Sequence, residues 1–277
     1  MNLEPILRLS VFIGVFLAMA LWERRGPKRA LDLPRGRRWL TNWAIAALDT
    51  LVVRLLFPLA AVGAALDAGA QGWGLFHALA WPGWLEFALT LIALDFAIWL
   101  QHLVSHKVPI LWRVHRVHHA DRDIDVTTAI RFHPVEIALS MALKIGLVYA
   151  LGADPWAVIA FEVILNGCAM FNHANITLPA PVERALRLVI VTPDMHRIHH
   201  SVERREHDSN YGFNLSVWDR LFGVYTADPA KGHQGMEIGL RPWRDDRPAR
   251  LGWALALPFR SEGMTEDAPP PAAADRA

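Results

Sequence analysis

The chain has one cysteine, Cys168, among its 277 residues. It therefore forms no internal disulfide, and it lacks the thiolates that an iron–sulfur cluster or a cysteine-rich zinc site requires. It also has no marked excess of charge, because 28 basic residues against 27 acidic ones leave a formal net charge of +1. No basic stripe with interleaved aromatic residues is present, so we expect no nucleic-acid partner. Cys168 itself lies in an apolar segment, where we expect a small buried residue.

Hydrophobic residues, by contrast, make up 53% of the chain, more than a soluble domain of this size usually needs. The excess is concentrated in long runs, and a helix that crosses a bilayer needs roughly twenty mainly apolar residues. The runs cover residues 5–22, 40–66, 84–103, 134–151 and 154–171. The last two are short for a full span, and a re-entrant or interfacial hairpin is the alternative for them. Basic residues follow the first run, so we interpret that run as a retained anchor instead of a signal peptide.

Basic residues also indicate the orientation in the membrane. They crowd the loop after the first run, whereas the loop at residues 67–74 has no lysine or arginine. The positive-inside rule then places the first loop in the cytoplasm and the amino terminus outside. Counting the spans forward puts residues 102–131 and everything after residue 171 in the cytoplasm as well. The basic residues of the first loop are Arg24, Arg25, Lys28, Arg29, Arg35, Arg37 and Arg38.

The expected fold is all-α: a bundle of about four or five transmembrane or re-entrant helices with a histidine-rich helical cap in the cytoplasm. Residues 1–83 are expected to form N-terminal membrane anchor helices, and residues 84–260 a domain that contains the histidine clusters. Residues 261–277 are polar and rich in proline, which predicts a disordered tail.

Nine of the 13 histidines fall into four short clusters. Positions i, i+3 and i+4 of a helix share a face, so each of the two His-x-x-His-His triplets brings three imidazoles together. One transition ion takes roughly four to six ligands, so nine imidazoles suit two ions that keep positions open for a substrate. The nine are His102, His106, His115, His118, His119, His173, His196, His199 and His200. We predict that they form a two-metal site, with solvated surface histidines as the alternative.

Other polar residues lie within the apolar runs. Asp95 shares one helical stripe with His102 and His106. Its carboxylate either orients a ligating imidazole or makes an unrelated packing hydrogen bond. Asp49 is a further ionisable residue inside a run. Lys144 is expected either to extend its ammonium to the membrane surface or to pair with Glu162.

The remaining candidates have weaker patterns. His133 lies at the cytoplasmic boundary of the membrane. It is expected to be a metal ligand, a residue that orients a ligand, or a gate for the substrate. Three carboxylates follow the second cluster and either orient its imidazoles or form a solvated turn; they are Asp121, Asp123 and Asp125. The segment Trp218-Asp219-Arg220 is expected to form a structural corner. The isolated histidines are expected to be ordinary polar residues; they are His77, His207 and His233.

The order of these clusters on a multi-span scaffold resembles the fatty acid hydroxylase and sterol desaturase superfamily. The match covers about residues 95–225 and includes segments 125–136, 192–196, 209–212 and 218–223, which resemble the bacterial branch. The resemblance implies that residues 84–260 are a catalytic domain with a histidine-bound di-iron centre that activates dioxygen. Family members often have a further histidine near the solitary His173, and this chain has Thr177 there. The ligand set is then expected to be the nine histidines alone, or to be completed by Asn175 or a water.

Together, the residues and the resemblance predict an oxidoreductase of the bacterial inner membrane, with its active site on the cytoplasmic side. It is expected to hydroxylate or desaturate a lipid with O2, using two iron ions. Imidazole also binds zinc, so zinc is the other expected ion. No flavin, haem or iron–sulfur motif is present in the chain, so electrons are expected from an external ferredoxin- or cytochrome-type donor. A zinc-dependent membrane hydrolase and a non-catalytic metal-binding membrane protein are the alternatives. The lipid substrate is left open.

Overall fold

The computed structural model describes residues 4–79 and 81–260, and the predicted tail at residues 261–277 lies outside them. Within the described residues the regular structure is helical, and extended pairing is limited to isolated bridges. Five helical segments are long and apolar enough to cross a membrane. The prediction of an all-α membrane bundle is therefore confirmed.

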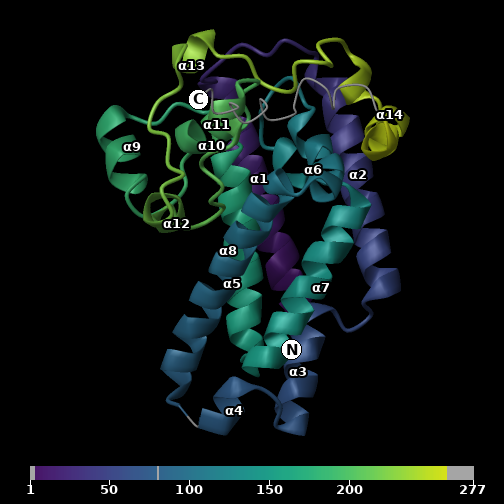
Figure 1. Cartoon of the computed structure of the whole chain (residues 1–277), viewed down its shortest axis with the longest axis vertical. Coiled ribbons are helices and arrows are strands. Elements are labelled where there is room, and N and C mark those ends of the chain that lie inside the picture. The colour runs from purple at the N-terminus through teal and green to yellow at the C-terminus, as the bar shows by residue number, and fades with distance from the viewer. Residues whose placement is uncertain (1–3, 80, 261–277) are drawn as a thin grey trace, which may run out of the picture.

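The long helices run side by side along the molecule (Figure 1). They are α1 (Glu4–Arg25), α2 (Arg35–Leu56), α3 (Ala60–Gln71), α5 (Gly83–Lys107), α7 (Pro134–Leu151) and α8 (Pro155–Asn172). A break at Pro58 separates α2 from α3, because proline cannot donate the backbone hydrogen bond that a continuous helix needs. The short α4 (Leu75–Leu79) follows α3 at the end of the bundle opposite the cap (Figure 1).

The hairpin of α7 and α8 extends along the bundle as far as the end of α3. Its turn contains Gly152, which has a positive φ of 67° and lies against Gly74, with a φ of 107°. A Cβ atom on Gly152 would lie 2.5 Å from the carbonyl oxygen of Trp73, so only glycine fits. Asp154 caps α8 by accepting hydrogen bonds from the backbone N–H groups of its first turn, as its position before Pro155 indicates.

Shorter helices form a cap at one end of the bundle (Figure 1). They are α6 (Pro109–His119), α9 (Ala180–Leu186), α10 (Pro193–His199), α11 (Arg204–His207), α12 (Val217–Leu221), α13 (Gly232–Gly235) and α14 (Leu251–Ala256). Three 3-10 turns complete the cap, at Thr128–Ile130, Arg247–Ala249 and Leu257–Phe259. The predicted histidine-rich cap is thus a set of short helices packed on the ends of the long ones.

Buried ion pairs join the cap and the bundle. Arg38 of α2 donates to Asp121 Oδ1 and to Asp125 Oδ2, each at 2.7 Å. Asp123 accepts backbone hydrogen bonds from residues 32 and 33 at 2.8 and 2.9 Å. All three aspartates are buried. Both predictions for them were therefore wrong: they neither bind imidazoles nor form a solvated turn, because the buried guanidinium of Arg38 needs their charge.

Several polar residues inside the spans also have partners. Lys144 lies 2.7 Å from Glu162, which confirms the predicted pair, and Arg8 reaches the other oxygen of Glu162 at 2.6 Å. Asp95 accepts a hydrogen bond from the indole Nε1 of Trp218 at 2.7 Å. Of the two interpretations of Asp95, the structure supports the packing hydrogen bond.

Candidate metal centre

The nine histidines of the predicted site converge in the cap, at the upper ends of the long helices. They form two groups, and within each group one ligand atom per histidine lies within 4.8 Å of all the others. The first group is His102, His106, His115, His119 and His199, and the second is His118, His173, His196 and His200. All nine side chains are buried, so the alternative of solvated surface histidines is wrong.

Short helices determine how the imidazoles divide between the groups. α6 begins with Pro109 at its first position, and α10 begins after Thr192, whose side chain accepts from the backbone N–H of Met195. In each triplet the residues at i and i+4 enter the same group, and the residue at i+3 enters the other. Successive helical residues are about 100° apart, so adjacent histidines such as His118 and His119 face different groups. The sequence predicted convergence within a triplet, and the structure instead divides each triplet.

The outer nitrogens of several imidazoles are held by backbone carbonyls. Nδ1 of His102 lies 2.7 Å from the oxygen of Tyr211, and Nδ1 of His199 lies 2.7 Å from the oxygen of Ser209. Equivalent contacts join His173 to Ala169 at 2.7 Å and His118 to Arg131 at 3.2 Å. A carbonyl oxygen only accepts, so in each ring Nδ1 carries the proton. The inner Nε2 atom then presents a lone pair to the centre.

A carboxylate performs the same role for His115. Nδ1 of His115 donates to Oε1 of Glu136 at 2.6 Å. Hydrogen bonding of this kind fixes the tautomer of a ligating histidine and raises its basicity. Sequence reasoning assigned no role to Glu136, although its place in the first turn of α7, three residues after His133, was the available signal.

The inner nitrogens approach one another too closely for neutral rings without a shared cation. Nε2 of His102 lies 2.9 Å from Nε2 of His199 and 3.1 Å from that of His115. In the second group, Nε2 of His173 lies 3.1 Å from that of His118. These rings already use their protons at Nδ1, so each contact opposes two lone pairs. A cation between them removes the repulsion.

The alternative of protonated rings is disfavoured by burial. Desolvation and neighbouring imidazoles lower the pKa of five histidines well below the usual range; they are His118, His119, His196, His199 and His200. Desolvation also lowers the pKa of His173, to about 4. Neutral imidazole is the form that binds a transition ion.

The donor set fits two transition ions. Ligand nitrogens that lie about 2.1 Å from an ion and at right angles are about 3.0 Å apart, which matches the observed contacts of 2.9–3.2 Å. Among the described residues, both nitrogens of His106 and of His200 have no hydrogen-bond partner, although both rings are buried. Those orphaned nitrogens are available to ions in the two groups.

Other candidate residues have different positions. His133 caps α7 by accepting from the backbone N–H of Val135, and it belongs to neither group. His207 is buried, with its ring stacked on Trp112, and it adjoins the first group through His106; the sequence did not indicate this position. His77 is exposed, and His233 lies 3.7 Å from Asp194.

Two further residues can be assigned from their hydrogen bonds. The amide of Asn175 is used by the backbone of Arg29, at 3.0 and 2.9 Å, so the suggestion that it completes the ligand set was wrong. Asp219 accepts from the indole of Trp99 and from the backbone of Tyr211 and Gly212, at 2.8–3.0 Å. This bonding confirms the structural corner.

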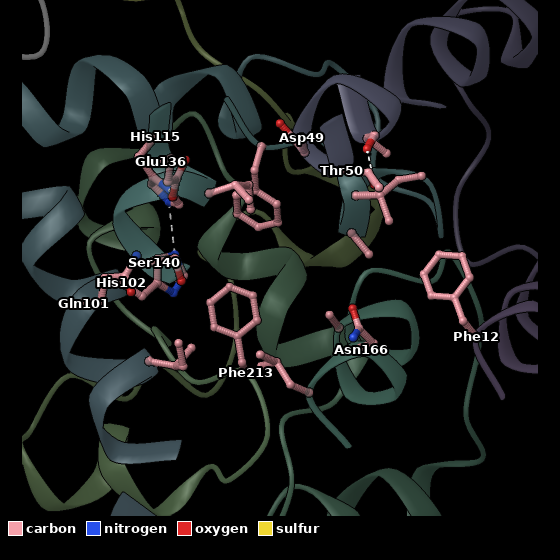
Figure 2. Close-up of a pocket in the computed structure, with 18 of the residues that line it drawn as sticks. Phe12, Asp49, Thr50, Gln101, His102, His115, Glu136, Ser140, Asn166 and Phe213 are labelled. Carbon is pink, nitrogen blue, oxygen red and sulfur yellow. Dashed lines mark hydrogen bonds and ion pairs between the residues drawn. The ribbon is translucent and has the colours of Figure 1, made fainter. Parts of the chain in front are cut away.

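A cavity of about 550 Å³ lies next to the first group. His102 and His115 line it, so a molecule that fills the cavity contacts the candidate metal centre. Figure 2 shows these two histidines on one side, with Phe213, Asn166 and Phe12 along the remaining wall. Apolar side chains from α1, α2, α5, α7 and α8 complete the lining. The arrangement can hold an apolar molecule against an ion-binding site.

Comparisons with known proteins agree with this site. A sequence profile described as fatty acid hydroxylase matches residues 87–224, which include all nine histidines. An ornithine lipid hydroxylase, OlsE, of Rhizobium tropici is 29% identical over 265 residues, covering 92% of this chain and 76% of that protein. Human alkylglycerol monooxygenase is 28% identical over 167 residues, which is 60% of this chain and 36% of the human protein. A cholesterol 25-hydroxylase-like protein of Danio rerio is 25% identical over 239 residues, covering 79% and 89%.

The extent of these matches differs. The chain spans about three quarters of the rhizobial protein and little more than a third of the human one. No solved structure matches the chain. The family match nevertheless covers the helices that supply the two histidine groups and part of the lining of the cavity beside them. The chain is an integral membrane protein that belongs to the fatty acid hydroxylase family.

Proposed function

We propose that this protein hydroxylates a membrane lipid with O2 at two iron ions bound by the nine histidines. The observation that carries the proposal is the pair of buried imidazole groups beside an apolar cavity. Its relatives are named hydroxylases and monooxygenases, which favours hydroxylation over desaturation.

The residues of the chain would hold the ions, orient the ligating imidazoles and bind the lipid. When bound, a pair of iron ions supplies the oxidising power that an unactivated C–H bond requires. The carbonyls of Tyr211 and Ser209 keep the tautomers of His102 and His199, and Glu136 keeps that of His115. The apolar lining of the cavity orients the lipid chain and excludes water.

We also propose how the protein is oriented in the membrane and where its electrons come from. The basic residues that follow α1 favour a cap in the cytoplasm of a bacterial cell, with the inner membrane around the long helices. Electrons would come from a separate ferredoxin- or cytochrome-type donor. A fusion of alkaline phosphatase after Arg260 should then be inactive, and a fluorescent-protein fusion at the same place should be bright; the reverse result would contradict the orientation.

Lipid analysis tests the reaction. Membranes that contain the protein, its iron and a reducing system should convert a cell lipid to a product heavier by one oxygen atom, and ¹⁸O2 should supply that atom. The His118→Ala variant, at matched expression, is the control without a complete second group. A zinc hydrolase would work without O2 and would introduce oxygen from water. Turnover under strict anaerobiosis would therefore refute the proposal, as would one metal ion per chain in fully loaded protein.

A further inference from the structure

One side of the cap exposes a group of large apolar side chains, which we call the apolar edge. Its members lie after α9 or in and directly after α12, and each is between 44% and 67% exposed; they are Leu188, Val189, Val217, Leu221 and Phe222. The two segments are neighbours, because the backbone N–H of residue 216 donates to the carbonyl of residue 189 at 3.0 Å. The apolar edge is therefore one continuous surface, in a part of the chain that the count of spans places outside the membrane.

Contacts with α5 determine the height of the apolar edge along the bundle. Phe222 stacks on the indole of Trp99, with ring centroids 4.7 Å apart. Trp218 donates from its indole to Asp95 at 2.7 Å, and the indole of Trp99 donates to Asp219 at 2.9 Å. α12 is thus fixed beside residues 95–99 of α5, and Figure 1 shows it next to the upper part of the long helices.

Residues 95–99 of α5 lie within the hydrocarbon layer of a bilayer. α5 has 25 residues and ends at Lys107. A helix of this length is about 38 Å long, so a layer about 30 Å thick leaves about five residues outside, and fewer if the helix is tilted. Trp99 lies eight residues before Lys107. It is therefore inside the layer even if all the outer residues are at that end, and α12 has the same depth.

The charged residues near the apolar edge suit the same surroundings. The acidic residues of segments 180–189 and 216–222 are Glu183 and Asp219, and both are buried and accept hydrogen bonds. Arg184 is exposed, and Arg220 is half-buried. The surface charge beside the apolar edge is therefore positive, and lipid phosphates are negative. Apolar side chains flanked by exposed basic residues are typical of segments that lie in the interface of a membrane.

We propose that the apolar edge is embedded in the leaflet on the side of the cap, with Arg184 at the level of the lipid phosphates. The occupant of this surface follows from its continuity with α5: the lipid that surrounds residues 95–99 of that helix also meets α12. The cap then does not lie wholly above the bilayer, and one part of it is an interfacial element. The proposal does not depend on the reaction that the protein catalyses.

Quenching by spin-labelled lipid tests the depth of the apolar edge. Leu188→Cys and Leu221→Cys, each in a Cys168→Ala background, would carry the fluorophore NBD in full-length protein. The protein would be placed in nanodiscs of phosphatidylcholine and phosphatidylglycerol, with or without a doxyl group on the acyl chain. Ile92→Cys, at an exposed position of α5, is the membrane control. Glu237→Cys is the water control, because it is exposed and follows α13 at the far end of the cap (Figure 1).

Both labels at the apolar edge should emit at short wavelength and be quenched nearly as much as the label at Ile92, and several times more than the label at Glu237. Arg184→Glu should reduce quenching of the label at Leu188, because like charges repel the phosphates. Arg205→Glu is the matched control, since Arg205 is an exposed arginine of α11 elsewhere in the cap. Equal quenching in these two variants would refute the phosphate contact of Arg184.

Two outcomes would overturn the membrane contact. Long-wavelength, unquenched emission like that at Glu237 would mean that the apolar edge is in water. Short-wavelength emission that doxyl lipid does not quench would mean that protein, such as a second copy of the chain, covers the apolar edge. Leu188 and Leu221 are exposed, so their replacement removes no core packing, and each position is measured separately. Neither measurement requires turnover, so failure of the proposed function would leave the result unchanged.

Discussion

Glu136 offers a sharp test of the candidate metal centre, because it would act on bound ions through His115. Its Oε1 accepts from Nδ1 of His115 at 2.6 Å, and the contact is buried. Loss of a carboxylate behind a ligating histidine typically costs about ten- to a hundredfold in metal affinity or activity. That range corresponds to about 1.4–2.7 kcal/mol. Glu136→Ala should fall within it.

Glu136→Gln should lose less, about tenfold at most, because its amide oxygen still accepts from Nδ1 and only the charge is removed. The assay is the chelator concentration that removes half of the bound iron, measured by elemental analysis of the detergent-solubilised protein. Glu237 provides the control, since it is exposed and its ion pair with Arg244 is 3.6 Å long. Both Glu237→Ala and Glu237→Gln should match the wild type.

Two results would refute this reasoning. One is a Glu136→Ala protein that releases iron at the same chelator concentration as the wild type. The other is a Glu136→Gln protein that binds iron more weakly than the alanine variant, which would mean that orientation of the imidazole is not what Glu136 provides. Circular dichroism of each variant separates loss of metal from loss of fold.

Three further predictions follow. His118→Ala and His199→Ala should lose metal and lipid product almost completely, whereas His77→Ala and His233→Ala should lose neither. His133→Ala should keep its metal but have a lower thermal midpoint, because a helix cap contributes about 1 kcal/mol to stability. Full metal content in His118→Ala would contradict the site. Since burial lowers the pKa of His173 to about 4 and that of its neighbours as well, the unfolded metal-free chain takes up protons that the folded chain does not. Stability is then complete above about pH 6.5 and falls toward pH 4, by up to about 1.4 kcal/mol per pH unit for each imidazole; equal thermal midpoints at pH 8 and pH 5 would refute this. Gly152→Ala should lower the thermal midpoint clearly more than Gly146→Ala does, because its Cβ would meet a carbonyl at 2.5 Å whereas that of Gly146 meets open space.

Local spacing was enough to find the elements and the nine histidines. The apolar runs at residues 134–151 and 154–171 coincide closely with α7 and α8, because a membrane helix can be recognised from the length and apolar composition of its segment. The pairing of Lys144 with Glu162 followed from the same reasoning, since two opposite charges in apolar surroundings need each other.

The division of the histidines between two groups could not be predicted from local spacing. It depends on how α6 and α10 face each other across the ends of α5 and α8, and those contacts are long-range. Asp121, Asp123 and Asp125 were misjudged for a related reason. Their partner, Arg38, lies more than 80 positions earlier in the chain, and a pattern of local spacing carries no signal of it.

The loop between α11 and α12 links these observations. Its carbonyls at Ser209 and Tyr211 accept from His199 and His102, so this loop determines which nitrogen of each ring faces the candidate metal centre. The loop is held in turn by Asp219, which accepts from the backbone of Tyr211 at 2.8 Å. A segment that supplies no candidate ligand thus orients two of the candidate ligands, His102 and His199. This explains physically why the resemblance to the family extends past His200, the last of the nine clustered histidines: the tautomers of His102 and His199 depend on a backbone that only the later residues position.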